Sequence, residues 1–185
     1  AAYFLVPNVT NRFNFWLHPM DYYDQSPGSF QIVEGMFGMA WGGLIGRGFG
    51  EGSPERVPFA ESDFIISSIG EELGLTAVIA VILLYGIVVE RALRTALVCR
   101  DGFGKLLAAG LSFSLALQCF VVVGGVTRVI PLTGLTMPFL SSGGSSLLAN
   151  WTLVAILLRI SDHARRPLPE ANAPSPVAEA RTEVV

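Results

Sequence analysis

Three long apolar runs fill most of the second half of the chain. Residues 73–89 and 106–127 contain no charged side chain, and a third uncharged run over 132–158 is interrupted by Pro138 and a cluster of glycines and serines. A helix of about 20 apolar residues crosses the roughly 30 Å hydrocarbon core of a bilayer. We therefore predict three complete transmembrane helices, the third within 142–158.

The residues before the first run have a mixed, more polar pattern. We expect residues 1–6 to be the end of another transmembrane helix whose beginning is missing, so that the chain is the C-terminal part of a larger polytopic protein. Residues 7–72 then form one large extracellular loop. The pattern predicts an all-α integral membrane protein, a fragment of a polytopic helical bundle.

Residues 29–46 within this loop have the periodicity of an amphipathic helix. Apolar side chains recur on one face, which would contact lipid or core: Phe30, Val33, Phe37, Ala40, Trp41 and Leu44. The other face carries Gln31, Gly35, Gly38 and Gly42. Glycines at this spacing permit close approach, either by another helix or by a substrate chain.

The composition agrees with a membrane protein. Of the 185 residues, 51% are hydrophobic and 15% are charged, whereas soluble domains carry roughly a quarter charged residues. The formal net charge is −3, and we expect membrane lipids but no nucleic acid among the partners.

Basic residues indicate how the chain is oriented. They gather after the first run and after the last: Arg91, Arg94, Arg100, Lys105, Arg159, Arg165 and Arg166. Because cytoplasmic loops of plasma-membrane proteins are rich in Lys and Arg, both segments are predicted to be cytoplasmic. Residues 162–185 would form a disordered cytoplasmic tail, because they are rich in proline, alanine and charge. The 7–72 loop would then face outward.

Four carboxylates precede the first apolar run in the stretch FAESDFIISSIGEELG: Glu61, Asp63, Glu71 and Glu72. Ser62 or Asp63 can cap a helix that continues into the bilayer, and at 100° per residue Ser67 and Glu71 share a side with Asp63. Asp63 is then either a carboxylate stabilised by the helix dipole or a general base at the outer surface. Glu71 and Glu72 either have a functional role, as ionisable residues at membrane depth often do, or form hydrogen bonds to neighbouring helices.

A second unusual stretch is RVIPLTGLTMPFLSSGGSS, residues 128–146. Pro131 and Pro138 rule out a regular helix in a segment that returns to the membrane, so we predict a re-entrant loop. A helix that restarts at SSGGSS would direct free backbone amides outward, which suits an anionic group such as pyrophosphate. A purely structural loop is the alternative.

These stretches, in this order, resemble the C-terminal half of the SEDS (shape, elongation, division and sporulation) family, which includes RodA and FtsW. The resemblance rests on RFNFWLHP (12–19), FQIVEGMFGMAWGGLIGRGFGEG (30–52), ESDFIISSIGEELG (61–74) and GGVTRVIPLTGLTMPFLSSGGSSLLANW (124–151). The stretches ALRTALVCRDGFGKLLAAGL (92–111) and RISDHARR (159–166) are most similar to actinobacterial RodA-type members. The family's pattern more often has tyrosine where this chain has Ser142.

The resemblance implies a ten-span peptidoglycan glycosyltransferase that polymerises lipid II and works with a class B penicillin-binding protein. It implies that Asp63 is the catalytic aspartate, which deprotonates the acceptor sugar or binds a divalent cation, Mg²⁺ or Mn²⁺. It also implies substrate-binding roles at other recurrent positions: Arg12, Glu72, Arg128, Ser141, Gly143, Gly144 and Ser145.

Two other functions stay open beside this one. A lipid flippase or transporter is suggested by the broken helix near 131–144, and a noncatalytic scaffold for a penicillin-binding protein would need no catalytic residue. We expect the fragment alone to be inactive, because a substrate cavity between spans needs further helices.

Overall fold

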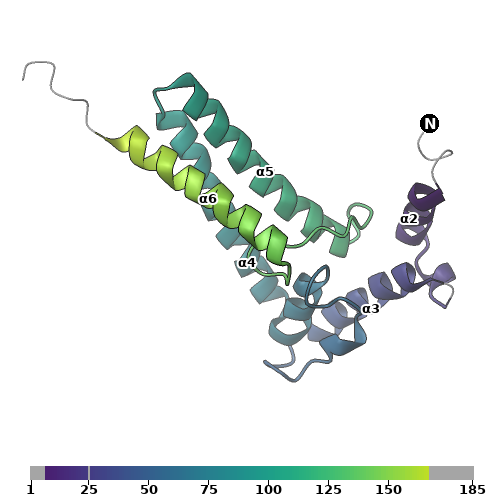
Figure 1. Ribbon diagram of the computed structural model, residues 1–185. Coiled ribbons are helices and arrows are strands. Elements are labelled where there is room, and N and C mark those ends of the chain that lie inside the picture. The colour runs from purple at the N-terminus through teal and green to yellow at the C-terminus, as the bar shows by residue number, and fades with distance from the viewer. Residues whose placement is uncertain (1–6, 25, 167–185) are drawn as a thin grey trace, which may run out of the picture.

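The computed structural model describes residues 7–24 and 26–166, and this part of the chain contains no β-strand. Its helices are α2 (Pro7–Leu17), η1 (Met20–Tyr22), α3 (Pro27–Gly42), η2 (Pro54–Arg56), α4 (Ile65–Val98), α5 (Gly102–Val126) and α6 (Gly144–Arg165). Figure 1 shows α4, α5 and α6 side by side, with α3 crossing one end of α4 and α2 beyond it. The predicted all-α bundle is confirmed.

The three helices of the bundle, α4, α5 and α6, are each long and apolar enough to cross a membrane. They present large apolar side chains on the outside of the described structure, such as Leu106, which is 76% exposed. A surface of this kind needs lipid or further helices to cover it. The prediction of three spans is therefore confirmed.

The helix ends differ from the predicted boundaries. The 34 residues of α4 are about 51 Å long, more than the roughly 40–45 Å of a whole bilayer, so α4 extends beyond the predicted 73–89 span. The last helix, α6, continues to Arg165, so 162–165 are helical and not part of a disordered tail. The rest of the predicted tail, from 167 onward, and residues 1–6 lie outside the described residues.

One apolar cluster lies at the end of the bundle where α3, α4, α5 and the loop after α5 meet. Its buried members are Ile32, Val57, Phe64, Ile66, Val78, Val122, Val126 and Met137. Burial of one such side chain stabilises the fold by about 1.5–3 kcal/mol. This cluster fixes α3 and the 128–143 loop against the turn before α4 and the first turns of α4, which together bear the four carboxylates.

The glycine face of α3 packs against the start of α4. A Cβ atom on Gly42 would lie 2.0 Å from the Gly70 carbonyl oxygen, and one on Gly35 would lie 2.8 Å from the Phe64 ring. Only glycine permits this approach, because real Cβ atoms do not come so close to backbone oxygen. Of the two predicted neighbours for this face, the structure shows another helix.

α4 is broken at Gly74, which has φ 79° and ψ 179°. A regular helix would bond the two amides after the break to the carbonyls of Glu71 and Glu72. Instead, residues 43–48 enter the break. They accept hydrogen bonds from the two amides and donate hydrogen bonds to the two carbonyl oxygens. The four bonds are Leu75 N to Gly43 O (2.9 Å), Thr76 N to Leu44 O (3.2 Å), Arg47 N to Glu71 O (3.1 Å) and Gly48 N to Glu72 O (2.9 Å). The break therefore leaves none of these backbone groups unpaired.

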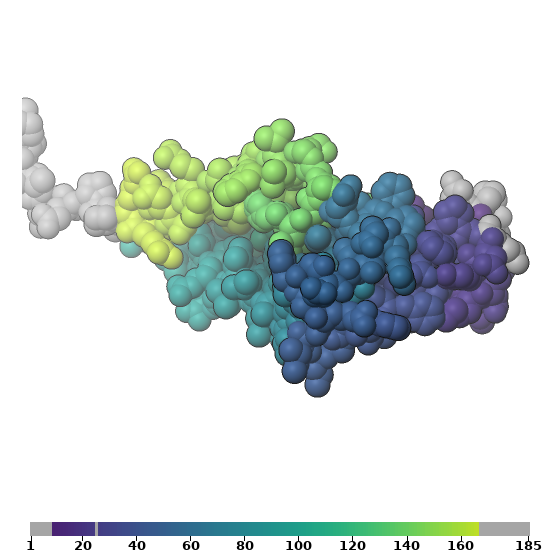
Figure 2. Space-filling view, turned by 90° about the horizontal axis from the view of Figure 1, so that it is seen from below, coloured from purple at the N-terminus to yellow at the C-terminus, as the bar shows by residue number. Residues whose placement is uncertain are grey.

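Figure 2 shows the molecule from the side that is lowest in Figure 1. The blue segment between α3 and α4 faces the viewer there and lies between the green and yellow of α6 and the purple of α2. The α3–α4 connection thus covers one end of the bundle.

Candidate active site

Asp63 lies in a pocket of about 240 Å³ that four separate segments of the chain build. The wall consists of Arg12 and Phe15 from α2, Gly28, Gln31 and Ile32 from α3, Asp63 itself, and Leu132 and Gly134 from the loop after α5. Two of the residues predicted for the site, Arg12 and Asp63, are therefore brought together. Gln31 was the one polar side chain on the predicted glycine face, and that signal could have assigned it to the site.

The carboxylate of Asp63 is not used as a helix cap. α4 begins at Ile65 with Phe64 as its N-cap and without a side-chain cap, so the prediction that Ser62 or Asp63 caps this helix is wrong. The reason is geometric, because a capping side chain must belong to the N-cap residue itself and Asp63 comes one residue earlier. Asp63 is half-buried, and its carboxylate accepts no hydrogen bond from the described residues. It can therefore accept one from a ligand.

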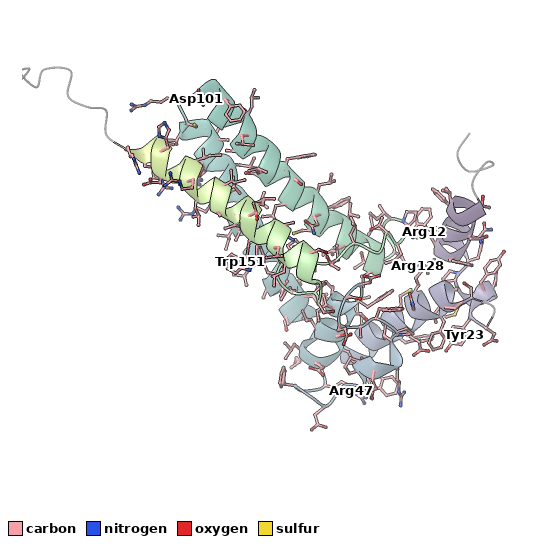
Figure 3. The ribbon with its side chains drawn as sticks, viewed as in Figure 1. Arg12, Tyr23, Arg47, Asp101, Arg128 and Trp151 are labelled. Carbon is pink, nitrogen blue, oxygen red and sulfur yellow. The ribbon has the colours of Figure 1, made fainter. Side chains whose placement is uncertain are left out.

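Arg12 connects α2 to the loop beside Asp63. Its Nη1 atom donates to the carbonyl oxygens of Leu132 at 3.0 Å and Thr133 at 3.3 Å. Figure 3 shows the Arg12 side chain at the end of the bundle that carries this loop. Arg12 forms no ion pair with Asp63 at 4.0 Å or less, so both groups present their charge to the pocket.

Gly134 brings the loop backbone next to Asp63. Its φ of 71° belongs to the left-handed region, and a Cβ atom added to it would lie 3.5 Å from Asp63 Oδ2. The loop is therefore part of the wall that a ligand of Asp63 would touch.

Ser141 fastens the same loop to the turn before Asp63. Its Oγ donates to the carbonyl oxygen of Ser62 at 2.5 Å and accepts from the amide of Met137 at 2.8 Å. The amide of Ser142 donates to the carbonyl oxygen of Glu61 at 2.8 Å. Ser141 thus bonds the loop to the turn that bears Asp63 and does not line the pocket, so its substrate-binding role stays a prediction.

The irregular loop has partners for its polar backbone. Gln118 Nε2 donates to the carbonyl oxygen of Thr136 at 3.0 Å, and the Tyr85 hydroxyl donates to that of Pro138. Met137 and Pro138 are buried. The predicted absence of a regular helix here is confirmed, because no helix lies between Val126 and Gly144. That the loop re-enters the membrane stays a prediction.

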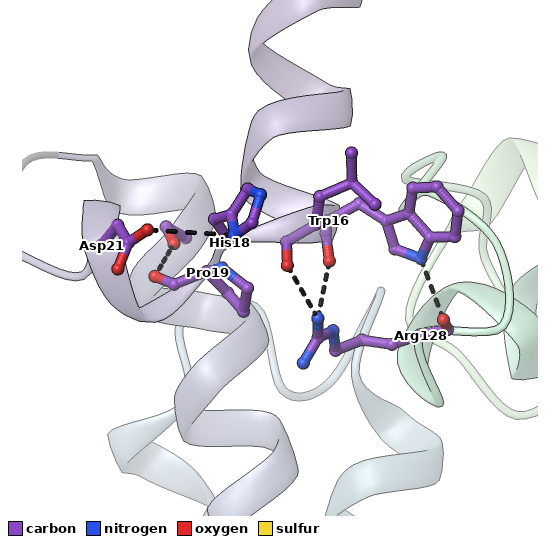
Figure 4. A network of polar contacts seen from close by, with 7 residues as sticks. Trp16, His18, Pro19, Asp21 and Arg128 are labelled. Atoms are coloured by element: carbon purple, nitrogen blue, oxygen red, sulfur yellow. Dashed lines mark hydrogen bonds and ion pairs between the residues drawn. The ribbon is translucent and has the colours of Figure 1, made fainter.

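Arg128 lies outside the pocket and holds the end of α2 (Figure 4). Its Nη2 donates to the carbonyl oxygens of Trp16 at 2.8 Å and Leu17 at 3.4 Å, while Trp16 Nε1 donates to the Arg128 carbonyl oxygen at 2.9 Å. Carbonyls at a helix C-terminus lack partners within the helix and favour a cation. A substrate-binding role for Arg128 stays a prediction, because its guanidinium contacts α2.

The remaining predicted site residues lie elsewhere. Gly143, Gly144 and Ser145 form the start of α6, which has no side-chain cap, and Gly144 and Ser145 are exposed. Glu72 lines a different pocket of about 470 Å³, together with Glu55 and Glu61. None of the four lines the Asp63 pocket, so their substrate-binding roles stay predictions.

A divalent cation at Asp63 also stays a prediction. Within the described residues, no three His, Cys, Asp or Glu side chains are grouped so that they could hold a metal ion. Asp63 is the one carboxylate of its pocket in this part of the chain. Mg²⁺ takes six oxygen ligands, so water and substrate phosphate would have to supply most of them. The residues do not build a metal site by themselves.

Comparison with known proteins gives one consistent family. Residues 1–166 match the family model FtsW/RodA/SpoVE, described as "cell cycle protein". The peptidoglycan glycosyltransferase RodA of Mycobacterium tuberculosis (strain H37Rv) is 55% identical over 186 residues, and that of Mycobacterium leprae is 52% identical over 185. Each alignment covers 100% of this chain and 39% of the relative. The chain thus spans about two fifths of the length of these relatives.

More distant relatives agree. The probable peptidoglycan glycosyltransferase FtsW of Geobacter metallireducens is 42% identical over 164 residues, with 86% of this chain and 43% of the relative covered. A solved structure from work on "Structural coordination of polymerization and crosslinking by a peptidoglycan synthase complex" is similar with a TM-score of 0.71 and 27% identity. The match covers 90% of this chain and 46% of that one.

Proposed function

The chain belongs to the FtsW/RodA/SpoVE (SEDS) family and is part of a multi-pass membrane protein. On this premise, we propose that the whole protein is a peptidoglycan glycosyltransferase that polymerises lipid II. The observation that carries the proposal is the Asp63 carboxylate, which no described residue bonds, in a pocket built from α2, α3, the turn before α4 and the 132–134 loop.

Asp63 acts as the general base of the transfer. A carboxylate oxygen accepts the proton of the acceptor sugar hydroxyl while the hydroxyl oxygen attacks the anomeric carbon of the donor. A new glycosidic C–O bond forms, the bond from the anomeric carbon to the lipid pyrophosphate breaks, and the pyrophosphate leaves with the electron pair. The positive charge of Arg12 on the same wall favours this anionic group.

The predicted orientation follows from where the fold gathers basic residues. The cytoplasmic end comprises the end of α4, the start of α5 and the end of α6, which Figure 1 shows together. Arg91, Arg94, Lys105 and Arg165 lie there, and the Asp63 pocket lies at the opposite end. The positive-inside rule then puts the C-terminus in the cytoplasm and Asp63 outside the plasma membrane.

A class B penicillin-binding protein is the proposed partner. The support is the similar solved structure, which comes from work on a peptidoglycan synthase complex, together with the named activity of the relatives. The two alternatives have less support. A transporter binds its substrate at broken helices near the bilayer midplane, whereas the irregular 131–144 stretch lies at the end of the bundle that carries the Asp63 pocket, and the break at Gly74 is near the same end of α4.

The test is lipid II polymerisation by the full-length protein with its partner. Asp63→Asn keeps the size of the side chain and removes the base, so the rate should fall by about 10²–10⁴-fold, while thermal stability stays the same. Asp21→Asn is the control, because Asp21 is an exposed carboxylate of the same loop that pairs with His18. A near wild-type rate for Asp63→Asn would overturn the proposed role. Lipid II translocation or partner activation without chain growth by the wild type would overturn the proposed function.

A further inference from the structure

A second pocket, of about 260 Å³, lies farther along α3 and is lined by both acidic and basic side chains. The charged residues are Glu34 from α3, Arg47 and Arg56 from the α3–α4 connection, and Glu71 from α4. Trp41 adds an aromatic ring. The proposed transfer reaction uses none of these five side chains.

The two carboxylates each have one oxygen bonded to the protein. Glu71 is 7% exposed, and its Oε1 accepts from the amide of Ser53 at 2.9 Å. Glu34 Oε1 accepts from the Tyr23 hydroxyl at 2.6 Å. No described residue donates a hydrogen bond to either Oε2 atom. A buried carboxylate is costly without full partners, so this site is suited to a ligand that donates hydrogen bonds and is positively charged.

The two arginines are available for an anion. Arg47 lies over the Trp41 ring, with 4.5 Å from Cζ to the ring centroid, and this cation–π contact leaves guanidinium N–H groups able to donate. Arg56 is exposed, and neither arginine forms an ion pair within the described residues. Two guanidinium groups at one pocket are typical of phosphate recognition.

The sequence of α4 indicates that the pocket is near the level of the lipid headgroups. Glu71 comes two residues before Leu73, where the uncharged run 73–89 begins, so it would lie about 3 Å outside a hydrocarbon core that begins at this run. The headgroup region on each side of a bilayer is about 5–8 Å thick. A lipid headgroup can therefore reach the pocket without leaving its layer.

Exposed apolar side chains connect the pocket to the lipid-facing surface of α4. Trp41 and Phe37 line the pocket and are 65% and 52% exposed, and Ile45 in the loop bonded into the α4 break is 85% exposed. The same loop adjoins Leu75, the first exposed apolar residue after the break. Acyl chains of a lipid bound at the pocket would lie against these exposed side chains.

We propose that the Glu34, Arg47, Arg56 and Glu71 pocket binds the headgroup of an ethanolamine phospholipid of the outer leaflet. The ammonium group donates to the free oxygens of Glu34 and Glu71, and the phosphate accepts from Arg47 and Arg56. A choline headgroup has no N–H to donate, and a glycerol headgroup has no positive charge. The pocket thus discriminates among these three headgroups by chemistry.

The experiment measures which lipid stays bound to the full-length protein, by native mass spectrometry after reconstitution with equal amounts of phosphatidylethanolamine, phosphatidylcholine and phosphatidylglycerol. The wild type should retain phosphatidylethanolamine about tenfold over the other two. Arg56→Gln changes an exposed side chain, so the protein should fold and lose this preference. Glu34→Gln should lose the preference over phosphatidylglycerol.

Arg94→Gln is the control, because Arg94 is an exposed arginine at the other end of α4, where it pairs with Glu90. The lipid preference of this variant should equal that of the wild type. Equal retention of the three lipids by the wild type would overturn the proposal, as would an unchanged preference in Arg56→Gln. Displacement of the lipid by a soluble peptide with a free amine and carboxylate would assign the pocket to a peptide and also overturn it. The readout involves no polymerisation, so it does not depend on the proposed activity.

Discussion

The two pockets along α3 use the same chemical group in opposite ways. The carboxylate of Asp63 is half-buried, accepts no hydrogen bond from the described residues and faces a wall of loop backbone. Glu71 is buried, its carboxylate accepts from the Ser53 amide, and a Cβ atom added to Gly38 would lie 3.0 Å from its Oε2. Both belong to one stretch of sequence, only eight positions apart. Their surroundings therefore differ: the Asp63 carboxylate is free to accept a hydrogen bond from a ligand, and the Glu71 carboxylate is held by Ser53.

Moving the Asp63 carboxylate without removing it should have the largest effect. Asp63→Glu adds one methylene in a pocket where Gly134 already lies close to Oδ2, so the base is displaced by about 1 Å and polymerisation should fall by about 10²-fold. Glu71→Asp, in contrast, should lower the melting temperature and change the polymerisation rate only slightly. A lipid II polymerisation assay measures the rate, and thermal unfolding of the full-length protein measures the melting temperature. A rate for Asp63→Glu equal to that of the wild type would show that its position is not important.

Forcing α3 away from α4 should disturb both pockets together. In Gly42→Ala the new Cβ would lie 2.0 Å from the Gly70 carbonyl oxygen, and the strain should destabilise the protein by about 3 kcal/mol. Gly110→Ala is the matched control, because nothing lies within 4 Å of a Cβ there. Thermal unfolding of the two variants gives the comparison, and equal melting temperatures would contradict the packing.

Arg128→Lys should loosen the Asp63 pocket and leave the Glu71 pocket unchanged. Lysine keeps the charge but lacks the planar fork that bonds the end of α2, and the loss should be about 2 kcal/mol. Hydrogen exchange of the α2 amides should then become faster, while that of α3 stays the same. Unchanged exchange in α2 would mean that Arg128 does not hold this helix.

Gly134→Ala tests the loop side of the Asp63 pocket with a smaller change. A left-handed φ of 71° costs a non-glycine residue roughly 1–2 kcal/mol, and the methyl group would touch Asp63 Oδ2. We expect a slightly lower melting temperature and a polymerisation rate reduced by about tenfold. A reduced melting temperature with a normal polymerisation rate would show that Gly134 does not contribute to the catalytic site.

The smallest effect concerns the Glu34 side of the second pocket. The hydrogen bond to Glu34 raises the pKa of Tyr23 above its usual value, with desolvation and the charges of Glu34 and Asp24 adding to the shift. The neutral phenol makes this bond, so its contribution is present below the ordinary tyrosine pKa and is lost as the pH rises through the raised value. Glu34→Gln should lower the pKa of Tyr23. Ultraviolet titration, with Tyr23→Phe to identify the signal, measures it.

Hydrophobic patterning was sufficient for the larger features. The spans, a helix over most of 29–46 and the close approach on its glycine face follow from residue spacing, because the bilayer and helix geometry impose fixed periods. The helix ends at Gly42, and Phe37 and Trp41 of its predicted apolar face are exposed. The likeness to a known family singled out Asp63, and the structure adds the pocket around it. The partition of the domains remains a prediction, since 1–6 and 167–185 lie outside the described residues.

Other features depend on contacts distant in sequence, and no local pattern could reveal them. The position of the N-cap depends on how the turn at Phe59 closes, so the cap was assigned to the wrong residues. Arg128 bonds α2 across more than a hundred residues, and nothing near it in the chain indicates which carbonyls it meets. The second pocket likewise combines Glu34, Arg56 and Glu71, which no periodicity relates.

The bonding of residues 43–48 at Gly74 has a mechanical consequence. Two of its four bonds hold Leu75 and Thr76 after the break, and two hold Glu71 and Glu72 before it, so the loop braces α4 on both sides of Gly74. Bending α4 at this glycine would break bonds worth about 1 kcal/mol each on both sides. A force that tilts the spanning part of α4 is thus transmitted to α3 and the turn that bears Asp63, and is not absorbed at the glycine.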